Sequence, residues 1–148
     1  MTSHDAPATG DLTYTRIFDA PRELVFRCMV SPEHLTHFWG PVGTSAPLDR
    51  ITVDPRPGGT FEIVIVNDAD GSTYRNRGVY VAVDEPERLV WTEPEIGMTV
   101  TTTFVALDDG RTEVRVHQAE VPESFRSPQA QAGFRSSFDR FAAYLATL

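Results

Sequence analysis

The stretch QAQAGFRSSFDRFAAYLATL, residues 129–148, decides the fold because it is the one long run with helical periodicity. Its large apolar residues recur at steps of four, three, four and three, which places them on one side of a helix: Phe134, Phe138, Phe141, Leu145 and Leu148. A helix with such a stripe must bury it against another element. The chain upstream should therefore supply a concave apolar surface.

The upstream chain predicts mainly β-strands joined by short turns. An opening strand over residues 12–18 precedes two short helices within residues 21–37. Six further strands follow, over residues 48–54, 60–67, 73–83, 89–93, 98–107 and 112–119. Consecutive strands with short connections form an antiparallel meander, which twists and curls. We predict an α+β fold in which a curved antiparallel sheet of about seven strands wraps around the C-terminal helix.

Length and composition predict one domain and a reducing compartment. A chain of 148 residues with 41% hydrophobic residues suits a single core, which we assign to residues 12–148. We expect residues 1–11 to be a disordered lead-in, because they hold no apolar run and so resemble neither a signal peptide nor a membrane anchor. Cys28 is the only cysteine, which excludes an internal disulfide and favours a buried packing role. We therefore expect a cytoplasmic protein.

The charge pattern argues against several functions. A net charge of −8 disfavours binding to nucleic acid or to an anionic membrane surface. All 13 basic residues are arginine, so no lysine can form a Schiff base or hold a phosphate in a P-loop. Ser136 and Ser137 lie in the predicted helix without the GxSxG elbow of a serine hydrolase. We expect no cofactor.

Side-chain alternation places two polar residues on the wall that faces the helix. If Leu89 and Trp91 point inward, so does Glu93, and the same parity carries Gln118 inward in its own strand. A carboxylate on an apolar wall would have a raised pKa, as ligand-orienting and acid/base groups often do. The alternative is that Glu93, which lies at a strand end beside Pro94, points to water.

Aromatic residues offer a second set of candidates. Phe38 and Trp39 stand where Gly40 and Pro41 break a helix, either as core plugs or as the lip of a cavity. Trp91 suits the sheet core. Tyr80 shares its parity with the small residues Gly78 and Ala82, so its hydroxyl could reach a ligand or make a structural hydrogen bond.

The histidines and two arginines have plainer interpretations. His34 and His37 have a spacing that can bind a metal, but His117 faces outward and no third ligand is evident, so we predict surface histidines and no metal site. Arg75 and Arg77 share a face and are expected to be solvated; turned inward, they would favour a carboxylate ligand.

The order of these elements and five short motifs carry a family resemblance. The motifs are FDAPRELVFRCMVSPEHLTHFWGP, RPGGTFEI, RGVYVAVDEPERLVW, DDGRTEVRVHQAEVPE and GFRSSFDRFAAYL. Their order and spacing, from about Leu12 to Leu148, resemble the START-like, or helix-grip, superfamily. More narrowly, they resemble the bacterial single-domain branch named for the activator of the heat-shock-protein-ninety ATPase.

The resemblance implies a cavity between sheet and helix that holds a small apolar molecule. We predict ligand contacts from thirteen residues: Phe38, Trp39, Phe61, Ile63, Tyr80, Trp91, Glu93, Thr102, Phe104, Gln118, Phe134, Phe138 and Phe141. A second hypothesis, also taken from the superfamily, is an aromatase/cyclase-like enzyme in which Glu93 moves protons. A co-chaperone or protein-interaction module ranks third, and a homodimer remains compatible with the sequence. The three phenylalanines of the helix could either floor the cavity or fill it.

Overall fold

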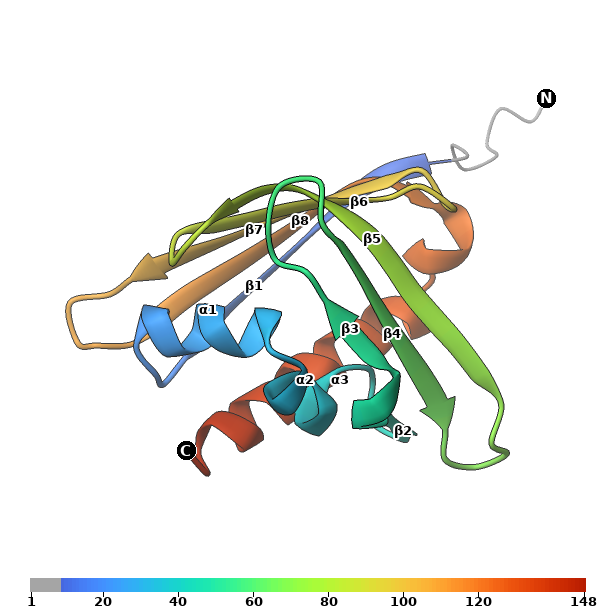
Figure 1. Ribbon diagram of the computed structural model, residues 1–148, viewed down its shortest axis with the longest axis horizontal. Helices are drawn as coiled ribbons and strands as arrows, with labels where there is room; N and C mark the ends of the chain where they lie inside the picture. The colour runs from blue at the N-terminus through green and yellow to red at the C-terminus, as the bar shows by residue number, and fades with distance from the viewer. Residues whose placement is uncertain (1–8) are drawn as a thin grey trace.

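One antiparallel sheet and three α-helices make up the computed structural model, which describes residues 9–148 (Figure 1). The strands are β1 (Thr9–Phe18), β2 (Thr44–Ser45), β3 (Ile51–Val53), β4 (Thr60–Asn67), β5 (Thr73–Asp84), β6 (Arg88–Glu93), β7 (Met98–Ala106) and β8 (Thr112–Pro122). The helices are α1 (Arg22–Val30), α2 (Pro32–Phe38) and α3 (Pro128–Leu145), with short 3-10 turns η1 (Leu48–Arg50) and η2 (Glu123–Arg126). The predicted α+β helix-grip fold is confirmed.

The sheet is an antiparallel meander whose first strand pairs with its last. Its order is β1-β8-β7-β6-β5-β4-β2, with β3 paired to β4, and every pairing is antiparallel. It arches over the helices, and α3 runs across its concave side (Figure 1). The first strand therefore lies beside the last, although the register partners Thr13 and His117 are 104 positions apart.

The apolar stripe of α3 faces this sheet and ends earlier than predicted. Phe138, Phe141 and Leu145 are buried and Phe134 is partly buried. Leu148 is 56% exposed, because α3 ends at Leu145 and the last turn carries it away from the core. The prediction that Leu148 belongs to the stripe is wrong.

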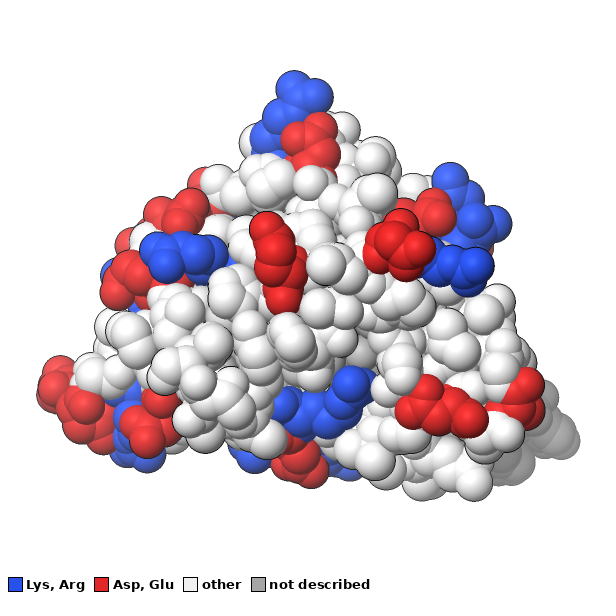
Figure 2. Space-filling view, turned by 60° about the horizontal axis from the view of Figure 1, so that its bottom comes forward, with Lys and Arg blue, Asp and Glu red and all other residues white. Residues whose placement is uncertain are grey.

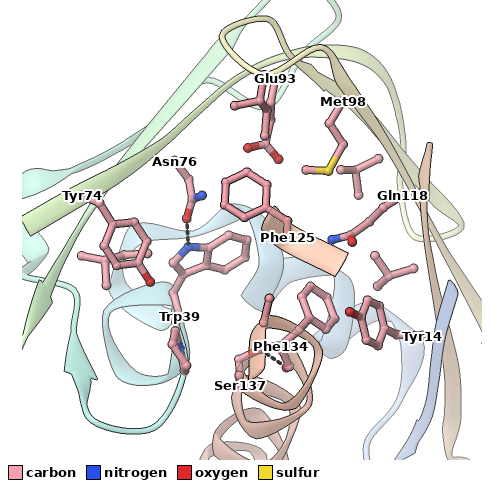
Figure 3. A pocket seen from close by; sticks show the side chains of 18 of the residues that line it. Tyr14, Trp39, Tyr74, Asn76, Glu93, Met98, Gln118, Phe125, Phe134 and Ser137 are labelled. Atoms are coloured by element: carbon pink, nitrogen blue, oxygen red, sulfur yellow. Dashed lines mark hydrogen bonds between the residues drawn. The ribbon is translucent and has the colours of Figure 1, made fainter. Parts of the chain in front are cut away.

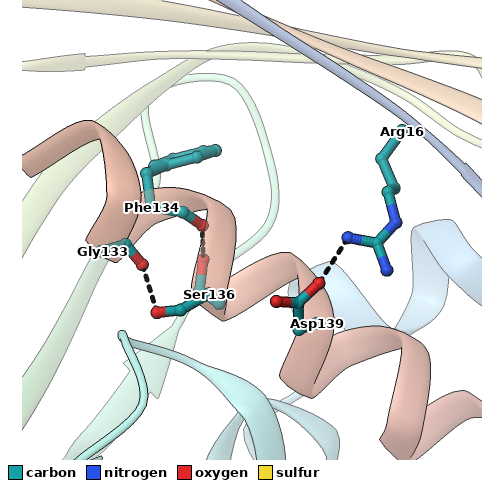
Figure 4. A network of polar contacts seen from close by, with 6 residues as sticks. Arg16, Gly133, Phe134, Ser136 and Asp139 are labelled. Carbon is teal, nitrogen blue, oxygen red and sulfur yellow. Dashed lines mark hydrogen bonds and ion pairs between the residues drawn. The ribbon is translucent and has the colours of Figure 1, made fainter. Parts of the chain in front are cut away.

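Polar contacts fix α3 against its surroundings (Figure 4). The Arg16 guanidinium of β1 lies 2.7 Å from the Asp139 carboxylate of the helix. Within α3, the Ser136 and Ser137 hydroxyls donate to the carbonyls of Gly133 and Phe134, each at 2.6 Å. Each serine hydroxyl thus bonds to a carbonyl three residues earlier in the same helix.

Several strand boundaries differ from the predictions. The sheet has eight strands instead of about seven, because Thr44 and Ser45 pair with the end of β4 as β2. Residues 48–50 form η1, so the strand expected over 48–54 shortens to β3. At the other edge, β1 begins at Thr9 and pairs with Pro122, so residues 9–11 are not a disordered lead-in. The disorder expected for residues 1–8 lies outside the described residues.

A β-bulge interrupts the alternation of β5. The register with β6 shifts between Tyr80 and Ala82, so Tyr80 pairs with Trp91 while Ala82 pairs with Val90. Val81, the extra residue, is 55% exposed. Ala82 therefore leaves the face that Tyr80 and Gly78 share, and the prediction that it shares their face is wrong.

The remaining general features concern charge, the thiol and membranes. Acidic and basic side chains are interspersed among wide uncharged areas on the face in Figure 2. Cys28 is buried, as predicted, and burial raises the pKa of its thiol to about 11. Among residues 9–148, no helix is both long enough and apolar enough to cross a membrane.

Candidate functional site

A cavity of about 710 Å³ lies between the concave face of the sheet and α3 (Figure 3). Strands β5 to β8 and β1 supply its walls, the turn after α2 supplies one side, and α3 supplies the floor. A volume of this size suits a small organic molecule. The sheet and helix thus enclose space between them as well as packing against each other.

Nine of the thirteen predicted residues line this cavity. They are Phe38, Trp39, Trp91, Glu93, Thr102, Gln118, Phe134, Phe138 and Phe141. Most are apolar or aromatic, which is typical of small-molecule pockets, and the polar members are few.

The other four predicted residues lie away from the large cavity. Phe61, Ile63 and Tyr80 border a much smaller void near α2, and Phe104 packs on Phe26 of α1, with ring centroids 5.2 Å apart. Helices α1 and α2 cover this part of the concave face, with α1 against β7 and α2 against β3. Inward parity was right for these residues, but they lie outside the large cavity, because parity does not show which part of a face a helix covers.

The phenylalanines of α3 form the floor of the cavity without filling it. Phe134 stacks on Tyr14 of β1 with ring centroids 4.1 Å apart, and Phe141 stacks on Phe38 at the same separation. Phe138 meets Phe18 edge-on at 5.6 Å. These contacts hold the rings against β1 and α2, so the space above them stays open.

Glu93 points into the cavity from the end of β6 (Figure 3). It is 9% exposed, and its Oε2 accepts a hydrogen bond from the Trp91 indole Nε1 at 3.1 Å. Burial raises the pKa of the Glu93 carboxyl, and the Trp91 hydrogen bond opposes this in part. Of the two alternatives for Glu93, the structure supports the inward one.

Trp39 forms the side wall and is fixed from two directions. Its indole Nε1 donates to the Asn76 Oδ1 of β5 at 3.0 Å (Figure 3). Behind it, Nη1 of Arg140 on α3 donates to the carbonyls of Trp39, Gly40 and Pro41 at 3.1, 2.9 and 3.3 Å. Hydrogen bonds from β5 and α3 therefore hold the segment after α2 at the edge of the cavity.

Several lining residues were not among the sequence candidates. Tyr14, Asn76 and Met98 lie on inward-facing strand positions, so strand parity could have identified them. Ser137 could have been identified from its position on the helix, three residues after Phe134 and four before Phe141. Phe125 lies in η2, is 47% exposed and sits at the cavity in Figure 3; no sequence periodicity indicates its position.

His34 and His37 of α2 both contact Tyr144 of α3. His34 hydrogen-bonds through Nδ1 to the Tyr144 hydroxyl at 2.5 Å, and His37 stacks on the same ring with centroids 4.9 Å apart. Among residues 9–148, no group of three or more His, Cys, Asp or Glu side chains could hold a metal ion.

Arg75 and Arg77 border the cavity, but their exposed guanidiniums pair with acidic groups. Arg75 lies 3.5 Å from Glu62, while Arg77 lies 3.2 Å from Glu62 and 3.1 Å from Glu95. The expectation of solvated arginines is confirmed, and neither offers an unpaired charge to a carboxylate ligand.

The fold and cavity define a class of protein, the helix-grip domain with an internal apolar site. A family model described as activator of Hsp90 ATPase homolog 1-like protein matches residues 19–146. The chain belongs to this family, which confirms the resemblance to the START-like superfamily. None of the curated proteins matches the sequence significantly.

Solved bacterial structures share this fold over nearly their whole length. Protein CV1439 from Chromobacterium violaceum is 24% identical with a TM-score of 0.82, covering 90% of this chain and 95% of that chain. Protein NE0264 from Nitrosomonas europaea is 25% identical with a TM-score of 0.80, covering 96% and 97%. The AHSA1 protein SPO3351 from Silicibacter pomeroyi is 23% identical with a TM-score of 0.77, covering 93% and 98%.

Proposed function

We propose that this protein binds a small, largely apolar molecule in the cavity between the sheet and α3. The observation that carries the proposal is the cavity itself, about 710 Å³ in volume and floored by phenylalanines that leave it open. Burial of apolar ligand surface would supply the binding energy, at roughly 25 cal/mol per Å² before the costs of association.

The two tryptophans give a direct assay. Trp39 and Trp91 are the only tryptophans of the sequence, and both line the cavity. When the uncharged apolar probe N-phenylnaphthylamine binds, tryptophan fluorescence should therefore decrease and the fluorescence of the probe should increase. Native mass spectrometry of freshly purified protein should also recover a copurified apolar molecule.

A matched pair of variants locates the probe. Ala130 lines the cavity and Ala132 is exposed on the same helix. Ala130→Trp should weaken probe binding about tenfold, which is about 1.4 kcal/mol, and Ala132→Trp should leave it unchanged. Equal effects of the two substitutions would place the probe elsewhere and refute the proposal.

One observation favours a second candidate, an aromatase/cyclase-like enzyme. Glu93 is a buried carboxyl with a raised pKa inside the cavity, as a general acid or base often is. Against this, the family is mostly non-enzymatic, and we rank binding first. Glu93→Gln would abolish turnover in an enzyme but would only change affinity in a binding protein.

A further inference from the structure

The end of the cavity at Glu93 holds two polar side chains with few hydrogen bonds to the rest of the protein. The Trp91 indole is the one hydrogen-bond partner of the Glu93 carboxyl among residues 9–148, and no arginine or histidine of these residues lies within ion-pair distance, 4.0 Å. Gln118 points into the same end from β8 (Figure 3), and its side-chain amide forms no hydrogen bond with another described residue. The two side chains lie on inward positions flanking β7, where Val100 pairs with both Trp91 and Gln118.

A ligand that fills this space should offer the Glu93 carboxylate a hydrogen-bond donor or a positive charge. A buried charge is costly unless it is paired or hydrogen-bonded. Water in the cavity can solvate the carboxylate before binding, but an apolar molecule would displace that water. A ligand that itself brings a donor to Glu93 replaces the lost water contacts, so such a ligand should bind best.

The side of the cavity formed by α2 and α3 is apolar. Phe38, Phe138 and Phe141 form an apolar region on α2 and α3, where a polar group of the ligand would find no partner among their side chains. The ligand should therefore have an apolar body and one polar end, oriented with that end toward Glu93.

The sign of charge at the polar end follows from the surroundings. A carboxylate ligand would meet the like charge of Glu93, and the bordering Arg77 is already paired with Glu62 and Glu95. The net charge of −8 also favours the approach of cations over anions. A protonated amine matches both the carboxylate and the overall field.

We infer that the ligand is an apolar molecule with an amine end, bound with its ammonium group against the Glu93 carboxylate and its apolar body over the phenylalanines of α3. This inference rests on the proposed binding function and assigns its ligand class. A hydroxyl end would satisfy Glu93 as a donor but would leave its charge unpaired. The order of affinity should therefore be amine, then alcohol, then hydrocarbon, with the carboxylate last.

Four compounds with one ring system test this order by displacement of N-phenylnaphthylamine. They are naphthylmethylamine, naphthylmethanol, methylnaphthalene and naphthoate. We expect the amine to bind at least about tenfold more tightly than methylnaphthalene, and naphthoate to bind more weakly than methylnaphthalene.

Two variants connect the preference to Glu93. Glu93→Gln keeps an acceptor for the Trp91 indole and removes the charge, so it should reduce the amine preference to less than about threefold and leave methylnaphthalene within about twofold. Glu87→Gln makes the same chemical change at a side chain that is 69% exposed and does not line the cavity, so it should leave the series unchanged.

The outcomes separate this inference from the proposed function. If methylnaphthalene and the probe bind but the amine shows no preference, or if naphthoate binds best, the inference is overturned and apolar binding stands. If neither methylnaphthalene nor the probe binds, both are overturned. If the Glu93→Gln variant fails to fold, the order of affinity of the four compounds for the unmodified protein still tests the preference for an amine.

Discussion

Gly78 should not tolerate even one added methyl group, because the Phe61 ring occupies the space. A Cβ at Gly78 would lie 2.3 and 2.6 Å from two ring atoms of Phe61 and 3.1 Å from the Thr92 carbonyl oxygen. The ring would have to retreat by about 1 Å to reach an ordinary contact near 3.4 Å. It is held in place by Tyr80 and Trp91, each with its ring centroid 5.4 Å away.

This geometry sets the size of the effect. Forcing extra volume into a packed core costs about 1–3 kcal/mol, which exceeds the roughly 0.4–1 kcal/mol gained when Gly→Ala restricts the unfolded chain. We therefore expect Gly78→Ala to lower the free energy of unfolding by about 1–2 kcal/mol. Trp91 should also move, because the displaced Phe61 ring lies against it.

Urea unfolding of a double-mutant cycle tests the cause. Phe61→Leu removes the obstructing ring atoms, so the double variant should be more stable than the sum of the two single losses predicts, by about 1 kcal/mol. Gly133→Ala is the control, since its Cβ would meet only Pro41 at 3.6 Å and should stabilise α3 by about 0.5–1 kcal/mol. Additive single effects, or a Gly78→Ala variant as stable as the parent, would refute the reasoning.

Three further predictions concern the walls and mouth of the cavity. Arg140→Met removes the hydrogen bonds to the carbonyls around Trp39 and should lower the free energy of unfolding in urea by about 2–3 kcal/mol. The control Arg135→Met, at an exposed side chain over the Tyr14 ring, should lower it by less than about 1 kcal/mol. Equal losses would show that Arg140 does not hold the segment around Trp39 in place. Because the folded-state pKa of Glu93 is raised above its ordinary 4.5, its contribution to stability should be fully present below pH 4.5 and be lost as the pH rises through the folded pKa. Glu93→Gln should therefore gain stability relative to the parent between pH 4.5 and pH 8, and a constant difference across unfolding curves in that interval would count against it. Phe125→Ser should raise the dissociation rate of N-phenylnaphthylamine about threefold in stopped-flow fluorescence and change the free energy of unfolding by less than about 0.5 kcal/mol, and an unchanged rate would show that Phe125 does not restrict exit.

Sequence periodicity identified the elements and most of the cavity because both depend on local alternation. Glu93 and Gln118 could be placed on the inner wall by counting from Trp91 and from neighbouring valines, and the structure puts both in the cavity. The same counting failed past Tyr80, where one extra residue in the bulge reverses the faces.

Other features depend on tertiary contacts that no local pattern records. The covering of Phe104 by α1 and the short pairing of Thr44 with β4 arise from where distant segments meet. Phe125 lies in a single 3-10 turn, too short to have a period. Arg140 could not be distinguished from a surface arginine of α3, because its partners are backbone carbonyls about 100 positions earlier in the chain.

The pairing of β1 with β8 has a consequence for how the chain matures in the cell. During synthesis, the segment that becomes β1 leaves the ribosome with its partner strand, Thr112–Pro122, still untranslated. Tyr14 and Phe18 then have neither the neighbouring strand nor the α3 rings that later cover them. Most of the sheet can assemble hairpin by hairpin, but the pairing of β1 with β8 can form only after β8 has been translated. Nascent chains arrested before residue 112 should therefore be the form most prone to aggregate and most in need of protection by chaperones.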